Sequence, residues 1–537
     1  MRARFGGPSR MPGDARTLPL RGTPLDALRA PSGRTLWGGR ARALARTSAA
    51  QRIAALALLA IVACSVLVVV MAANRPSILS PTTHSSFYPH WMAGPLGGIW
   101  PGLTRSTNTL KYLFTGAIVL MYASYLLALA YVPRLRARWA IAAVVVVHAI
   151  YLLAPPLALT DVFNYINYGR MEVVHHLNPY TTIPILEPHN DPSYDLSNWH
   201  QLLSPYGPLF TLLTFVVVPL GVAASFWALK GILAVTSLAV MVLVWKCARL
   251  LGRDPVVALV LVGLNPIVLV WGLGGDHNDF LMVFFILLGF YLLLLARTRD
   301  HDHERPAEEG PSPTGEPRTV PRGGWLAALS PADIGAGAAF VTAAAIKASG
   351  GVLIPVVLAG LLSSRRRLAQ VVLGMAAAGV VLGAASLIAF GLHIPDLSTQ
   401  SRLVTNVSVP NLIGLALGSG GETESLHLIL SATLGVSMLL CCVQAWRRRD
   451  SITACGWASV ALLVTLSWVL PWYVLWVLPL AALSSSRRLR GAALALGVYL
   501  IIAWAPASGL LWSAIGFHPE KTSLGRLHQR YVKELLN

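Results

Sequence analysis

The chain has 537 residues, of which 55% are hydrophobic and only 12% are charged, and its formal net charge is +19. Several uninterrupted apolar runs are about 20 residues long, enough to cross the hydrocarbon core of a bilayer, so a water-soluble globular protein is excluded. The basic residues form short clusters between these runs, at 133–138, 363–367, 446–449 and 486–490. This is the pattern of cytoplasmic membrane loops and not of a nucleic-acid-binding surface. The sequence therefore predicts an all-α, polytopic transmembrane protein.

Hydropathy predicts about eleven to fourteen crossings, depending on how broken segments are counted. The first apolar run begins too late and is too long for a cleaved signal peptide, so it is expected to be a true span. The predicted spans are 53–73, 112–132, 139–159, 207–223, 226–245, 255–273, 279–296, 333–362, 368–390, 426–444, 451–470, 473–486 and 491–511.

Two polar segments set the expected domain organisation. Residues 1–52 carry eleven Arg, no Lys and two Asp, a composition that buries too little apolar surface to fold, and we predict a disordered cytoplasmic tail. Residues 297–332 mix five Arg with six acidic residues and are predicted as a disordered linker. The linker divides an N-terminal transmembrane half (53–296) from a C-terminal half (333–511), which a C-terminal tail follows (512–537).

The basic clusters also predict which side each loop faces. Because the tail and the cluster at 133–138 are expected in the cytoplasm, the loops 74–111 and 160–206 fall on the extracytoplasmic side. If the basic segment that follows residue 245 is cytoplasmic as well, residues 207–245 must cross an odd number of times. That parity predicts a broken or re-entrant helix near Pro219.

The start of the long loop 160–206 carries the first candidate for chemistry. "LTDVFNYINYGRMEVVHHLNPY" (159–180) has apolar residues at roughly helical spacing and is predicted to be an amphipathic helix that lies in the membrane interface. Asp161 follows Thr160, a good N-cap residue, so its carboxylate has a structural explanation at the positive end of a helix. The functional alternative is a general base that deprotonates an acceptor hydroxyl.

A polar island, "GGDHNDF" (274–280), interrupts two apolar stretches. An Asp at the centre of a membrane helix costs about 2.5 to 3.5 kcal/mol on insertion scales, so Asp276, His277 and Asp279 are expected at a span end or around a wet cavity. The structural alternative is a solvated turn that caps the next helix. A metal site shared with "PHNDP" (188–192) is a weaker possibility.

Lys347 stands alone in an apolar segment at "KASGG" (347–351), where two half-helices are expected to meet. It either snorkels to the interface or provides a cation for a phosphate group, together with Arg402. "SWVLPWYVLW" (467–476) places Trp472 and Tyr473 either in an aromatic belt or on a surface that stacks against a sugar or prenyl chain. The five cysteines are odd in number and show no metal-ligand spacing, so neither a disulfide framework nor a zinc site is predicted.

Taken in order, "TDVFNYINYGR...NPY", "SPYGPL", "NP...GGDHND" and "PWYVLWVLPL" resemble the polyprenol-phosphomannose-dependent alpha-1,6-mannosyltransferases, members of the multi-spanning C-type (GT-C-like) glycosyltransferase superfamily. The resemblance covers roughly residues 110–510. It implies a polyprenyl phosphomannose donor, a membrane-anchored mannan acceptor of the lipomannan type, and transfer on the extracytoplasmic face of the cell membrane. No cofactor and no metal are implied.

The resemblance also implies roles for single residues. The acidic residue at the start of the large extracytoplasmic loop maps onto Asp161, as the catalytic base of an inverting displacement. In that superfamily it commonly follows the first span, whereas here it follows the third, so the first two spans are interpreted as an N-terminal addition. Lys347 and Arg402 are the expected donor-phosphate ligands. The expected substrate-binding residues are Asn164, Arg170, Tyr206, Asp276, His277, Asp279, Trp472 and Tyr473.

Two other function classes stay open at this point. Intramembrane ionisable residues also mark the pathways of secondary transporters or flippases, although the absence of an internal repeat and the position of the polar groups at span ends favour an enzyme. A non-catalytic scaffold in an envelope assembly complex is the third hypothesis.

Overall fold

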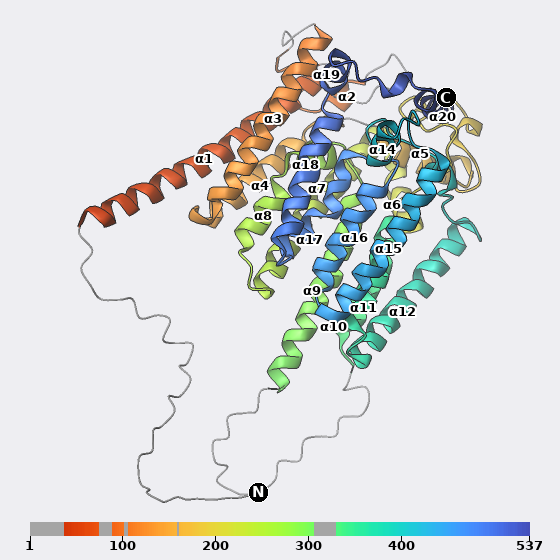
Figure 1. Cartoon of the computed structure of the whole chain (residues 1–537). Coiled ribbons are helices and arrows are strands. Elements are labelled where there is room, and N and C mark those ends of the chain that lie inside the picture. Colours follow the sequence, from red (N-terminus) through yellow and green to blue (C-terminus); the bar gives the residue numbers. More distant parts are fainter. Residues whose placement is uncertain (1–36, 75–88, 101–105, 158–159, 305–328, 537) are drawn as a thin grey trace, which may run out of the picture. The chain divides into compact units, whose positions relative to one another are not determined.

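The computed structural model describes residues 37–74, 89–100, 106–157, 160–304 and 329–536. Residues 50–537 form one compact unit, and of the separate unit 1–49 only the start of helix α1 (Trp37–Asn74) is described. The described residues fold into helices and loops without a strand, which confirms the predicted all-α class (Figure 1).

The longer helices are listed here with their bounds. They are α3 (Thr107–Tyr131), α4 (Ala137–Leu152), α5 (Asp161–His175), α6 (Pro208–Val217), α7 (Val222–Leu250), α8 (Pro255–Gly263), α9 (Asp279–Glu304), α10 (Pro331–Ile346), α11 (Ile354–Leu361), α12 (Arg365–Phe390), α14 (Val409–Ala416), α15 (Glu424–Arg448), α16 (Ser451–Thr465), α18 (Arg487–Trp504) and α20 (Ser523–Leu536). The short elements used below are η4 (Val218–Leu220), η5 (Val268–Leu273), η7 (Ala348–Leu353), α13 (Ser398–Ser401), η8 (Pro471–Trp476), α17 (Leu478–Leu483), α19 (Ser508–Ala514) and η9 (Pro519–Lys521).

Polar residues mark where many of these helices begin. Their side chains accept hydrogen bonds from backbone N–H groups of the first turn, which would otherwise lack partners. Residues that cap in this way are Ser106, Asp254, Ser330, Ser408, Thr423, Asp450 and Ser486. At these seven positions the local sequence therefore determines where the helix begins.

Among the described residues, six helices are long and apolar enough to cross a membrane, and the pair α18 and α19, bent by 74°, would make a seventh. A polytopic protein is thus confirmed. The predicted eleven to fourteen crossings exceed this count because the other predicted spans correspond to apolar helices of 10–17 residues, which are too short to span individually.

Two of the predicted interruptions are present. α6 ends at Val217, and η4 and Gly221, with a φ of 81°, separate it from α7, as expected for a broken helix near Pro219. The second break lies at Lys347, whose extended backbone separates α10 from η7 and α11. Both breaks leave backbone groups that neighbouring elements can contact within the helical unit.

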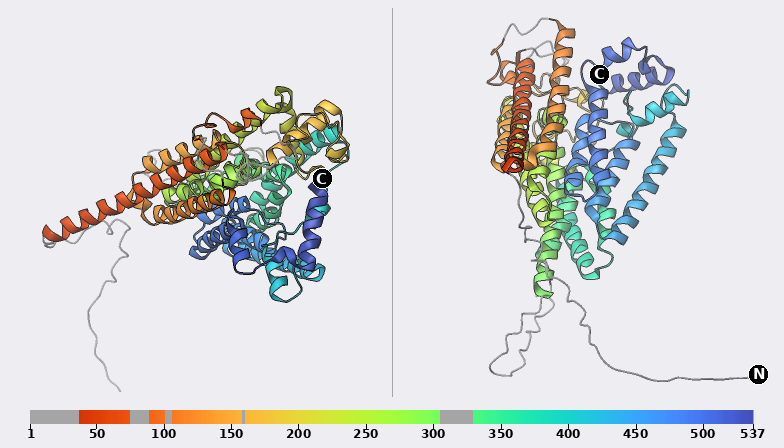
Figure 2. Two further views of the ribbon diagram at one scale, coloured as in Figure 1. Left: turned by 90° about the horizontal axis from the view of Figure 1, so that it is seen from above. Right: turned by 60° about the vertical axis from the view of Figure 1, so that its left-hand side comes forward.

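The helices run side by side, with α9, α10 and α12 in contact and α7 packed on α9 (Figures 1 and 2). α15 packs on α11 and α16, and α17 on α8. α1 extends into residues 37–52 of the predicted tail, and α9 and α10 extend into the predicted linker. The other residues of these two segments, 1–36 and 305–328, lie outside the described residues, so the predicted division into domains stays a prediction.

One end of the unit gathers arginine side chains. A cavity of about 610 Å³ is lined by Arg253, Arg297, Arg367, Arg448 and Arg449. Arg297 is on α9, and a rise of about 1.5 Å per residue places it about 27 Å from the start of that helix at residue 279. That separation is close to the thickness of a bilayer core.

Candidate active site

Helix α5 places Asp161 at its first residue. Thr160 occupies the N-cap position, but its buried hydroxyl makes no hydrogen bond among the described residues, so the predicted side-chain cap is not formed. The Thr160 carbonyl instead accepts from the Phe163 and Asn164 amides, at 2.9 and 3.1 Å. The Asp161 side chain is 16% exposed. It is therefore both held at a helix N-terminus and accessible.

α5 differs from the amphipathic interfacial helix that the sequence predicted. Nine of the ten residues 162–171 are buried, on every side of the helix: Val162, Phe163, Asn164, Tyr165, Ile166, Asn167, Tyr168, Gly169 and Met171. The buried side chains of Asn164 and Asn167 form hydrogen bonds with the loop that follows, to Asn198 and Ser193. The helix is thus an internal support for the site, because the long loop folds back over it.

The chain between η5 and α9 brings His277 to Asp161. His277 Nδ1 lies 3.2 Å from Asp161 Oδ2, within ion-pair distance but without the alignment of a hydrogen bond. The imidazole stacks on Trp472, with ring centroids 3.5 Å apart and planes at 12°. Gly275 makes room for this ring, because a Cβ there would lie 2.6 Å from His277 Nε2. Packing, more than hydrogen bonding, orients this histidine.

Asp276 is paired with Lys230, a residue that sequence reasoning missed. Lys230 Nζ lies 2.8 and 3.1 Å from the two carboxylate oxygens, and both side chains are 1% exposed. Asp276 has a φ of 57°, a conformation that Asp tolerates better than most residues. The available signal was a lysine inside a predicted span, since such a charge requires a partner in the bilayer interior.

Asp279 joins the two halves of the unit. Its Oδ2 accepts from Lys347 Nζ at 2.8 Å, and its Oδ1 accepts from Trp476 Nε1 at 2.5 Å. The Lys347 ammonium also lies over the rings of Tyr473 and Trp476, at 5.1 and 5.6 Å from their centroids. Lys347 keeps 19% of its side chain exposed. It can therefore still meet a ligand.

The burial and the contacts of the polar island, residues 274–280, decide between its two interpretations, a solvated turn and a set of side chains around a cavity. The side chains from residue 276 to residue 279 are at most 1% exposed, so the island is not a solvated turn. Asn278 does not cap α9 with its side chain, whose amide nitrogen and oxygen make no hydrogen bond among the described residues. Three carboxylates, Asp161, Asp276 and Asp279, each face a different basic side chain.

The "SPYG" segment forms the next part of the wall. Tyr206 packs its ring edge against Tyr165, with centroids 4.7 Å apart, and the Gly207 amide donates to the Ile346 carbonyl at 3.0 Å. A Cβ at Gly207 would lie 2.2 Å from the Ala345 carbonyl oxygen. This glycine therefore permits the close approach of the segment that ends in Lys347.

Asn164 and Arg170 hold the long loop against α5. Asn164 Oδ1 accepts from the Asn198 amide at 3.0 Å, and Arg170 binds both oxygens of Asp191, with Nε at 2.9 and 3.0 Å. Burial pushes the pKa of Asp191 upward, but the hydrogen bonds from Arg170, Ser193 and His175 hold it below its usual value. Because Asp191 is engaged in this way, these contacts do not favour the metal site considered for "PHNDP".

Arg402 is not a member of the three charge pairs. It is exposed at the C-terminal end of α13 and makes no ion pair with any carboxylate of the described residues. Of the two expected phosphate ligands, the structure places only Lys347 beside Asp279. The remaining expected residues, Tyr206, Trp472 and Tyr473, gather around Asp161, His277 and Lys347, and their roles in substrate binding stay predictions.

Comparisons with known proteins identify the family. The model described as "Alpha-(1->6)-mannopyranosyltransferase, N-terminal domain" matches residues 59–363, more than half of the chain, and the model described as "MptB C-terminal domain" matches residues 404–517. The chain belongs to the alpha-(1->6)-mannopyranosyltransferase family. This confirms the resemblance inferred from the motifs, and with it the expected class of hexosyltransferase.

Relatives of this mannopyranosyltransferase family extend over most of the chain. Alpha-(1->6)-mannopyranosyltransferase A of Mycobacterium tuberculosis is 28% identical over 389 residues, 66% of this chain and 67% of the relative. A second alpha-(1->6)-mannopyranosyltransferase of that organism is 28% identical over 64% of this chain and 65% of its own length. The form A enzyme of Corynebacterium glutamicum is 31% identical over 27% of this chain and 30% of the relative. The chain thus spans about two thirds of the two longer matches, and no solved structure matches it.

Most residues of the candidate site fall within the two family matches. The N-terminal match includes Asp161, Lys230 and Lys347, and the C-terminal match includes Trp472 and Trp476, whereas Arg402 lies between the two. The N-terminal match begins at residue 59, inside α1, so the family itself includes most of the first two predicted spans, and their interpretation as an addition relative to the wider superfamily stays a prediction.

Proposed function

We propose that this chain is a mannosyltransferase of the cell membrane that moves mannose from polyprenyl phosphomannose to a membrane-anchored mannan, forming an alpha-1,6 linkage on the extracytoplasmic face. Family membership supports the sugar and the linkage. The single structural observation that carries the proposal is the accessible carboxylate of Asp161 at a helix N-terminus, beside His277 and near a lysine that can meet a phosphate.

The proposed reaction is a direct displacement. The acceptor hydroxyl oxygen attacks C1 of the mannosyl donor, and the C1–O bond to phosphate breaks with its electron pair leaving on the polyprenyl phosphate. Asp161 accepts the hydroxyl proton, and a beta-linked donor gives an alpha-linked product.

Lys347 is the proposed ligand of the departing phosphate. A phosphate leaving group gains charge as the bond breaks, so a preorganised cation stabilises the transition state more than a proton donor would. Asp279 and the faces of Tyr473 and Trp476 orient the ammonium without covering it. Arg402 is proposed as a second phosphate ligand on the strength of its sequence position alone.

The charge distribution supports the proposed extracytoplasmic location. The arginine-lined cavity lies about 27 Å along α9 from Asp279, and arginine-rich ends of membrane proteins face the cytoplasm. The charge pairs then lie at the opposite face, where the long loop 160–206 covers them. The family matches favour this transferase over a transporter or a scaffold.

The experiment is transfer from polyprenyl phosphomannose to a mannan acceptor by purified protein in lipid nanodiscs. Asp161→Asn is expected to reduce kcat by about 10² to 10⁴-fold, the usual contribution of a general base. Asp195→Asn, an exposed aspartate in the same loop, serves as the matched control. Full activity of Asp161→Asn would show that Asp161 is not the catalytic base. If the unmodified chain transfers no mannose, the proposed function is wrong.

A further inference from the structure

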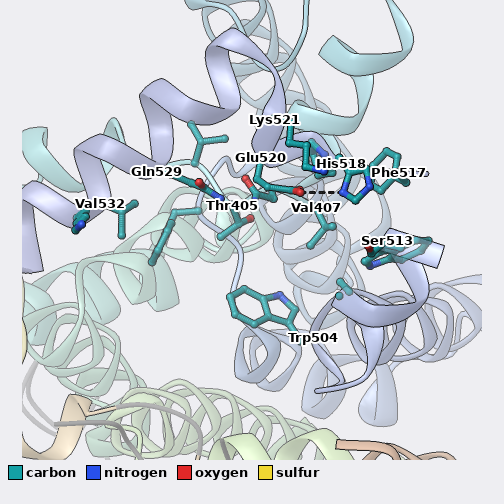
Figure 3. Close-up of a pocket in the computed structure, with 18 of the residues that line it drawn as sticks. Thr405, Val407, Trp504, Ser513, Phe517, His518, Glu520, Lys521, Gln529 and Val532 are labelled. Atoms are coloured by element: carbon teal, nitrogen blue, oxygen red, sulfur yellow. Dashed lines mark hydrogen bonds and ion pairs between the residues drawn. The ribbon is translucent and has the colours of Figure 1, made fainter. Parts of the chain in front are cut away.

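A second concave site lies at the C-terminal end of the chain, away from the three charge pairs. It has a volume of about 820 Å³ (Figure 3), within the range of sites that hold organic ligands. Its walls are the segment 404–407, Trp468, the end of α18, α19, η9 and one side of α20. None of the residues assigned above to chemistry lines it.

One part of the wall is aromatic. Trp468, Trp504, Trp512 and Phe517 line the cavity, and the indole N–H groups of Trp504 and Trp512 are buried without a hydrogen-bond partner among the described residues. The flat indole rings that line the cavity indicate a ligand with apolar faces of its own.

The rest of the wall is polar. Glu520, whose Oε1 lies 3.0 Å from His518 Nδ1, lines the cavity together with Lys521 and Gln529 (Figure 3). Lys533 is a further lining residue. Carboxylate, ammonium and amide groups together can bond hydroxyl groups as both donors and acceptors. Carbohydrates present hydroxyls at their edges and C–H groups on their faces. A prenyl chain, in contrast, offers no hydrogen-bonding group to Lys521, Gln529 or Lys533.

Short stretches of chain connect this cavity to Asp161. Trp468 precedes Trp472, which stacks on His277, by four residues, so their Cα atoms are at most about 14 Å apart. On the other side, Trp199 packs its edge on Trp468, with centroids 6.3 Å apart, and its amide donates to Asn164 Oδ1 at 3.4 Å. Asn164 is one helical turn from Asp161.

We propose that this cavity binds the acceptor glycan, a few hexose units away from the hydroxyl that receives the new sugar. The inference rests on the proposed function and adds the place where the growing chain is held. It predicts that long acceptors, which can occupy both the region of Asp161 and the indole faces, bind more tightly than a disaccharide.

The test compares acceptor lengths with purified full-length protein in nanodiscs. Trp512→Leu and Lys533→Ala are expected to raise the KM for a soluble alpha-1,6-linked mannohexaose at least tenfold, with the KM for polyprenyl phosphomannose and for a mannobiose acceptor unchanged. Matched controls are Trp446→Leu, an exposed tryptophan on α15, and Arg530→Ala, an exposed cation on α20 that does not line the cavity. Lys533 is exposed, so its variant tests the cavity without risk to folding.

Three outcomes are decisive. An unchanged hexasaccharide KM in both variants overturns the inference, and so does a raised KM for the donor, which would assign the cavity to the prenyl chain. If the unmodified chain transfers no mannose, the proposed function fails, and the cavity is judged by quenching of tryptophan fluorescence with mannohexaose. Quenching that Lys533→Ala weakens and Arg530→Ala does not would still support a glycan site.

Discussion

At the scale of single residues, each acidic side chain of the site has its own partner. The pair of Asp276 and Lys230 is the most buried of the three charge pairs. Its two side chains are in direct contact, with Lys230 Nζ 2.8 Å from Asp276 Oδ1. Asp161 is the most accessible of the three carboxylates, since Asp276 and Asp279 are both 1% exposed. Accessibility therefore separates the proposed base from two carboxylates that hold lysines.

Removing one member of the buried pair is expected to be costly. Lys230→Met leaves Asp276 without its counter-charge and should lower the free energy of unfolding by about 3 to 5 kcal/mol. Lys230→Met with Asp276→Asn should recover part of this loss, because Asn is neutral and tolerates a positive φ. Thermal unfolding in detergent measures both, and Lys246→Met, which removes an exposed lysine of α7, is the control. Equal stability of Lys230→Met and the unmodified chain would contradict this account.

At the scale of elements, the breaks in helices position the site. α6 and α10 meet where Gly207 donates to the Ile346 carbonyl, one residue before Lys347. The break at Lys347 then turns its side chain toward Asp279 at the start of α9. The "SPYG" motif, which ends where the predicted span 207–223 begins, is explained by this contact between helix ends.

Gly207→Ala is expected to disturb that contact. The added Cβ would lie 2.2 Å from a backbone oxygen, which is too close, so the α10–η7 break must move. Overpacking of this kind costs about 1 to 3 kcal/mol, and a displacement of about 1 Å at Lys347 can lower kcat about 10²-fold. Gly231→Ala on α7, where a Cβ meets no atom within 4 Å, should leave activity unchanged. Steady-state transfer kinetics of Gly207→Ala and Gly231→Ala test this prediction.

At the scale of the whole molecule, the site is assembled from both sides of the predicted linker. Asp279 belongs to the N-terminal half, whereas Lys347 and Trp476 belong to the C-terminal half. Arg367 on α12 pairs with Asp333 and also donates to the Leu293 carbonyl of α9 at 2.7 Å. The two halves are thus joined by packing and by buried polar contacts.

Cutting the chain between residues 305 and 328 is therefore expected to leave the halves together. A protease site inserted there and cleaved in nanodiscs should give two fragments that co-elute and that retain transfer activity within about a factor of two, because the contacts named above are non-covalent. The uncleaved insertion variant is the control. Fragments that separate in mild detergent would show that these contacts do not suffice.

The sequence by itself determined the helical membrane class, the two helix breaks, the family and the place of Asp161 at a helix start. These follow from hydropathy, from Pro and Gly, and from short motifs, all of which act over a few residues. Only the tertiary structure decided that α5 is buried, that Lys230 pairs with Asp276, and that Lys347 contacts Asp279. Such pairings join residues far apart in the chain, and which charges meet depends on how the helices pack, a property that no local pattern encodes.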